Sequence, residues 1–130
     1  MEIAQFSKCQ DSLNEAAFLM HQAVERFYTC VLLVHTLYGP KSHNIKFLRT
    51  LAEDQDKRLI EAWPRATKRD RATFELLKKA YIEARYSEHY QITEAQLDWL
   101  ADCTTRLQAL VEATCKERLE VFKAEAERTS

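Results

Sequence analysis

The sequence predicts a single all-α domain, a bundle of four to five helices, and three observations support this fold class. The chain holds one glycine, Gly39, and two prolines, Pro40 and Pro64, so it has few places for turns. Helix-favouring residues fill the intervals between them, and no stretch has the pattern of a strand. Of the 130 residues, 46% are hydrophobic and 10% aromatic, which suffices for one packed core. We therefore assign residues 1–130 to one domain.

The first part of the chain is expected to form two helices. A short helix covers residues 2–10, and the Ser-x-x-Glu pattern of Ser12 and Glu15 then begins a second one. The second helix is apolar on most sides, which predicts that it lies at the centre of the bundle, in a subunit interface, or both. Gly39 ends it by adopting the left-handed conformation, and Pro40 cannot continue the helix.

Four further elements are expected after this break: a helix over residues 44–54, a turn over 59–63, a helix over 67–86 and a last helix from 93. Thr67 with Asp70 and Thr93 with Gln96 supply the capping patterns that begin the two longer helices. The last helix is expected to exceed about thirty residues and to project beyond the bundle. Its polar end, residues 124–130, is expected to fray.

The cysteines and the hydropathy pattern indicate a reducing, aqueous environment. The four cysteines are scattered without a Cys-x-x-Cys pair, which predicts reduced, core-filling thiols and neither disulfides nor a metal site: Cys9, Cys30, Cys103 and Cys115. No apolar stretch is long enough to cross a membrane, and the first residues do not begin a secretory signal. We expect a cytoplasmic protein with no membrane partner.

The near-neutral net charge of −1 hides an uneven distribution. Residues 65–86 hold seven Lys or Arg against three Asp or Glu, whereas residues 87–130 hold five against nine. A local basic strip can steer an anion even when the whole molecule is almost neutral. The alternative, an ordinary solvated helix face, fits the same pattern equally well.

One run of residues resembles the signature helix of the HEPN domain family. It extends from Ala17 to Tyr28 and contains the sequence His-Gln-Ala-Val-Glu followed by an aromatic residue. Three further matches follow in the family's order: Tyr38 to His43 with Leu48, the segment Ala84-Arg85-Tyr86, and a closing long helix. Together they cover roughly residues 14–112, and an ordered set across several helices is more specific than one short motif.

The resemblance implies an up-and-down helical bundle that commonly forms homodimers and accompanies a minimal nucleotidyltransferase. The chain is most similar to this classical, nucleotidyltransferase-associated branch. One glycine and no strand leave no place for the transferase's own nucleotide-binding turn, so that catalysis is not expected here. We expect a nucleotide- or RNA-phosphate-binding and dimerisation module without a cofactor. Whether such a pair would be a toxin–antitoxin system is left open.

Two alternatives remain. A second HEPN branch consists of metal-independent ribonucleases, which carry an arginine, four to six residues and then a histidine. No arginine here has that spacing; Arg85 and His89 have three residues between them, and Arg26 and His35 have eight. Arg85 and His89 would nevertheless carry the runner-up ribonuclease function, because an i, i+4 pair can share a helix face. The second alternative is a pure interaction domain.

Two groups of residues are candidates for binding a phosphate. Lys41 and His43 follow the Gly-Pro break and precede a helix whose free N–H groups suit an anion, although His43 or Ser42 could simply cap that helix. The second group lies near the end of the helix over residues 67–86: Lys78, Lys79, Arg85, Tyr86, His89 and Tyr90. Arg85 can clamp a phosphate with two hydrogen bonds, while Tyr86 or Tyr90 stacks on a base. Cations there also complement the helix dipole and could serve stability alone.

Four polar residues of the second helix are expected to serve packing. His21, Gln22 and Glu25 share one side of the helix among apolar neighbours, which favours a structural hydrogen-bond network or dimer contacts over catalysis. His35 is assigned to the packed or interfacial surface.

Overall fold

The computed structural model describes the backbone of residues 2–129 and the side chains of residues 9–129. Five helical elements follow one another: α1 (Glu2–Thr36), α2 (Ile45–Gln55), the 3-10 helix η1 (Lys57–Ala62), α3 (Lys68–Tyr86) and α4 (Glu94–Thr129). No strand occurs within the described range. The predicted all-α bundle is confirmed. Within this part of the chain, no helix combines the length and apolar character needed to cross a membrane.

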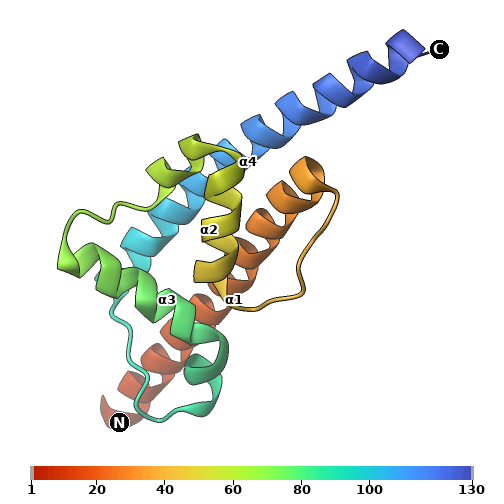
Figure 1. The fold of residues 1–130 in the computed structure, drawn as a ribbon. Coiled ribbons are helices and arrows are strands. Elements are labelled where there is room, and N and C mark those ends of the chain that lie inside the picture. The colour runs from red at the N-terminus through yellow and green to blue at the C-terminus, as the bar shows by residue number, and fades with distance from the viewer. Residues whose placement is uncertain (1, 130) are drawn as a thin grey trace.

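Helix α1 is the centre of the bundle, and it packs against α2, α3 and α4 (Figure 1). The predicted break before Ser12 is wrong, because α1 is continuous across that residue. Ser12 is exposed and neither Gly nor Pro precedes Gly39, so nothing interrupts the hydrogen-bond ladder. The buried residues Ala17, Val24 and Val31 recur every seven positions, which places them on one stripe facing the core.

Helix α1 ends through a different residue from the predicted Gly39. The helix ends at Thr36, and Leu37 adopts the left-handed conformation with φ 63° while its N–H donates to the Leu33 carbonyl at 2.9 Å. Gly39 has no positive φ, so its predicted left-handed role is wrong. A Cβ at Gly39 would lie 3.2 Å from Thr29 Cγ2. The glycine therefore allows the loop to pass close to α1.

The later helices begin at side-chain caps. Asn44 accepts hydrogen bonds from the N–H groups of Lys46 and Phe47, so neither His43 nor Ser42 is the N-cap of α2. The predicted caps of the two longer helices are confirmed. The Thr67 hydroxyl accepts a hydrogen bond from the Asp70 N–H. The Thr93 N–H donates to the Gln96 side chain at 2.9 Å, and the Gln96 N–H donates to the Thr93 hydroxyl at 3.1 Å.

Helix α4 is long, and its last turns leave the bundle (Figure 1). Its buried side chains end at Cys115, and Leu119 beyond them is 55% exposed. The end that was expected to fray is helical as far as Thr129, while Ser130 lies outside the described residues. The segment after Cys115 consists mainly of residues that favour helix and contains no Gly or Pro, which explains why the helix continues although it no longer packs on the bundle.

The cysteines only partly follow the expectation. All four are free, but Cys9 and Cys30 are exposed, so the prediction that all four fill the core is wrong. Cys103 and Cys115 are buried, and burial raises the pKa of both thiols. Cys30 Sγ on α1 lies 3.9 Å from Cys115 Sγ on α4, where the two helices pack together.

Candidate functional site

Two histidines gather around one tyrosine where α1, the α1–α2 loop and α3 meet. His43 pairs through Nδ1 with Glu25 Oε1 at 2.5 Å, and its ring stacks on Tyr81 with centroids 4.3 Å apart. The His21 ring also lies close to Tyr81, with the ring centroids 5.4 Å apart. Sequence analysis named both histidines and Glu25 but not Tyr81.

His21 is fully buried, and neither ring nitrogen has a hydrogen-bond partner among the described residues. Burial is the main cause that lowers the pKa of His21; the Glu25 carboxylate and the His43 backbone act in the opposite direction, and the charge of the His43 ring adds to the lowering. Gln22 is half-buried and makes no side-chain hydrogen bond within the described range. The structure therefore joins Glu25 to His43 of the loop and leaves His21 as a neutral core residue.

His35, the fourth residue assigned to packing, lies near the end of α1 and is half-buried. Burial and the nearby Arg118 lower its pKa. Lys41, predicted with His43 as an anion ligand, is exposed in the α1–α2 loop. It lines an open hollow of about 550 Å³ together with Glu25 and Cys30.

The predicted cluster at the end of α3 is dispersed. Arg85 covers the Phe18 ring at 4.8 Å and the Tyr86 ring at 5.4 Å. Tyr90 is 4% exposed and donates its hydroxyl to the Leu76 carbonyl, so its ring is part of the core and has no face for a base.

The remaining members of that cluster do not converge on one point. Lys78 lies 3.9 Å from Glu75, whereas Lys79 is exposed. His89 lies in the turn beyond the end of α3 at Tyr86, so it shares no helix face with Arg85. The hollows that Arg85 lines also contain carboxylates, from Asp11, Glu15 and Glu88. These acids reduce the attraction of this surface for a phosphate.

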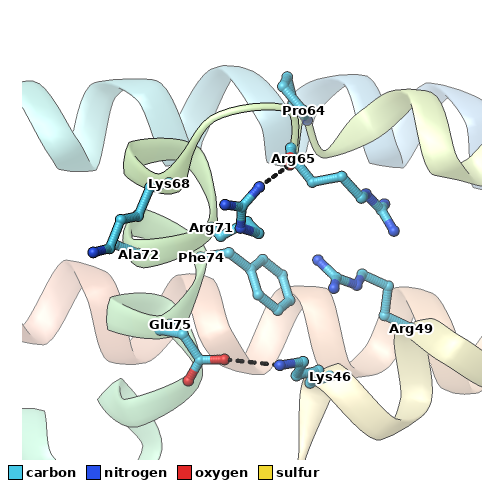
Figure 2. Close-up of a pocket in the computed structure, with 9 residues that line it drawn as sticks. All are labelled: Lys46, Arg49, Pro64, Arg65, Lys68, Arg71, Ala72, Phe74 and Glu75. Atoms are coloured by element: carbon cyan, nitrogen blue, oxygen red, sulfur yellow. Dashed lines mark hydrogen bonds and ion pairs between the residues drawn. The ribbon is translucent and has the colours of Figure 1, made fainter.

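The strongest concentration of positive charge lies elsewhere, in a cavity between α2 and α3 (Figure 2). The cavity measures about 350 Å³ and is lined by five cationic side chains and a single carboxylate: Lys46, Arg49, Arg65, Lys68, Arg71 and Glu75. We call it the basic pocket. None of these residues was among the predicted ligands.

Two of the five cations in the basic pocket are already paired. Arg65 makes two parallel hydrogen bonds to Glu53, of 3.0 and 2.7 Å, and Lys46 lies 3.3 Å from Glu75. Arg49 packs over the Phe74 ring at 4.1 Å. Burial and the neighbouring Arg65 lower the pKa of Arg49, although a guanidinium remains charged at neutral pH.

Part of this pocket was visible in the sequence. Arg65, Lys68 and Arg71 belong to the basic strip over residues 65–86, but the candidate ligands were chosen from its other end. Lys46 and Arg49 come from α2, whose segment has no excess of positive charge. Only the packing of α2 beside α3 brings the two sets together.

Comparison with known proteins supports the resemblance seen in the motifs. The family model of the HEPN domain matches residues 1–117, nearly the whole described chain. The chain belongs to the HEPN domain family. No curated protein matches its sequence. The HEPN match ends close to Cys115, the last buried residue of α4, so the projecting end of α4 lies outside it.

Among the described residues of this HEPN domain, no group of three or more His, Cys, Asp or Glu side chains is arranged to hold a metal ion. Three other features are candidates for a functional role: the His43–Glu25 pair beside Tyr81, Arg85 over its two aromatic rings, and the basic pocket. Of these, the basic pocket is best suited to an anion, because three of its cations form no close ion pair with any carboxylate that the structure describes.

Proposed function

We propose that this HEPN chain is a dimerising binding module that serves a minimal nucleotidyltransferase in the cytoplasm and recruits a nucleotide or RNA phosphate for it. Membership of the HEPN family supports the partner and the ligand, and the observation that carries the dimerisation is apolar surface left open on the central helix. Leu19 and Leu33 of α1 are 56% and 52% exposed. They are fourteen positions apart, close to four helical turns, and so share one face.

The open face continues at the end of α1, where Leu37 is 77% and Tyr38 68% exposed. A row of large apolar side chains on the central helix of a small domain is typical of a contact surface. A second copy of the chain is the simplest occupant, since homodimers with twofold symmetry are the commonest oligomers. Burial of this apolar face against a second copy of the same chain is favourable, which supports dimerisation.

Light scattering at micromolar concentration tests dimerisation. We expect a particle of twice the 15.2 kDa chain mass, and we expect Leu33→Glu to convert it to a monomer because a charge would be buried in the interface. The matched control is Ile82→Glu, an exposed apolar residue on α3 that should leave the dimer intact. A wild-type protein that stays monomeric contradicts the proposal.

Calorimetry tests the ligand and partner. ATP, GTP and a short RNA are each titrated into the chain, alone and together with a minimal nucleotidyltransferase. Binding to the chain or the pair supports recruitment. Absence of heat in every combination would leave only the second alternative, a pure interaction domain.

A further inference from the structure

The basic pocket carries more positive charge than the protein itself neutralises. Arg65 is paired with Glu53 and Lys46 with Glu75. The other three cations, Arg49, Lys68 and Arg71, form no close ion pair with a carboxylate among the described residues, although Glu53 and Glu75 attract Arg49 at longer range. Like charges around one cavity repel each other, so an anion with two or three negative charges would be strongly favoured there.

The arginines of the pocket are held in place before any ligand binds. Arg71 Nη1 donates to the Arg65 carbonyl at 2.8 Å, which fixes its guanidinium against the loop that leads into α3 (Figure 2). The Arg49 guanidinium lies over the Phe74 ring at 4.1 Å, and its buried Nε has no hydrogen-bond partner among the residues that the structure describes. Each guanidinium has five N–H groups, so donors remain for a ligand. Fixed side chains lose little conformational freedom on binding, which increases affinity.

The pocket offers phosphate contacts but no surface on which a base could stack. Phe74 is 3% exposed, with Arg49 over its ring and the Trp63 ring at an angle of 71° to it, 4.9 Å away. The remaining apolar lining comes from Pro64 and Ala72. A volume of about 350 Å³ is near the lower limit for small-ligand pockets.

We propose that the basic pocket binds a small polyphosphate, a chain of two or three linked phosphate groups, and recognises the phosphates without reading a base. The proposal rests on the phosphate-binding part of the proposed function and names its ligand and its site. The phosphate chain comes either from a nucleoside triphosphate or from an inorganic polyphosphate. In both cases Arg49, Lys68 and Arg71 supply positive charge that offsets most of the charge of the phosphate chain.

Isothermal titration of the full chain with tripolyphosphate, ATP, GTP and a short single-stranded RNA tests the ligand class. We expect the Kd values of tripolyphosphate, ATP and GTP to agree within about threefold, and the RNA to bind more weakly. A nucleotide that binds more than about tenfold tighter than tripolyphosphate would show that a base is read. RNA as the tightest ligand would overturn the proposal as well.

Charge-reversal variants test whether the basic pocket is the binding site. Lys68 and Arg71 are exposed, so Lys68→Glu and Arg71→Glu should fold normally, as circular dichroism can check, and each should weaken tripolyphosphate binding by about tenfold or more. Lys116→Glu makes the same charge change at an exposed site on α4 and should leave the Kd within about twofold.

The outcomes separate the two levels of the proposal. Wild-type affinity in both pocket variants would mean that the phosphate site is elsewhere, while phosphate binding itself would stand. Nucleotide binding that the pocket variants weaken, without any tripolyphosphate binding, would overturn only the base-independent recognition. If no phosphate compound binds, the phosphate-binding part of the proposed function fails too, whereas dimerisation is measured separately by light scattering.

Discussion

His21 shows how burial changes the chemistry of a single residue. Its ring is fully buried beside Tyr81, and burial lowers its pKa because the charged form loses its hydration. In the unfolded chain the same imidazole takes up a proton near its ordinary pKa of 6.5. Below that pH the unfolded state therefore binds more protons than the folded state, and stability is lost as the pH falls.

We predict that the free energy of unfolding decreases between about pH 7 and about pH 5.5, by at most about 1.4 kcal/mol per pH unit for this one group. His21→Leu should reduce the slope, whatever it does to stability at a single pH, because the buried site then has no proton to exclude. Urea denaturation at several pH values measures the slope. An unchanged slope in the variant would assign the pH dependence to other groups, among which His35 also has a lowered pKa.

At the scale of elements, α4 consists of two parts with different roles. The part up to Cys115 packs on α1 and η1, whereas all residues from Lys123 to Thr129 are exposed. Phe122 is the last partly buried side chain, and Arg118 covers its ring at 4.6 Å. The final turns therefore contribute helix without contributing to the core.

Removal of the residues after Phe122 should change the free energy of unfolding by less than about 0.5 kcal/mol, because no buried surface is lost. Thermal or urea denaturation measures this. Leu107→Ala, at a fully buried position of the same helix, should by contrast cost about 2–5 kcal/mol. A large loss on truncation would show that another molecule packs against the end of α4.

At the scale of the whole molecule, RNA cleavage would need residues from two regions or two protomers. Metal-free cleavage requires an acid or base and a cation at one phosphate. Arg85 lies on α3 and His89 in the following turn, so one helix face does not present both. In a dimer, the partner subunit could supply the missing group.

We therefore predict that the purified protein leaves RNA intact in the presence of a chelator, as gel electrophoresis of a labelled RNA can check. If the protein cleaves RNA, and both Arg85→Ala and His89→Ala abolish cleavage while the dimer is preserved, the ribonuclease function would be favoured over the binding module. Cleavage that survives both substitutions would indicate a contaminating nuclease.

The sequence by itself determined the features that depend on neighbouring residues. The scarcity of Gly and Pro predicted the helices, and the Thr67 and Thr93 caps could be recognised because a cap and its N–H partner are three residues apart. The HEPN family could likewise be recognised from an ordered set of local motifs. Ser12 shows the limit of such patterns, since a capping sequence does not begin a helix where the preceding chain is already helical.

Tertiary structure decided everything that depends on which helices lie side by side. Tyr90 could not be known as a core residue until α3 packed over it, and Tyr81 could not be known as the partner of His43. The basic pocket forms because Arg49 of α2 and Arg71 of α3 face one cavity, although twenty-one residues lie between them in the sequence. A charge pattern records how many cations a segment carries, but electrostatic attraction depends on their distances in space, and packing alone sets those distances.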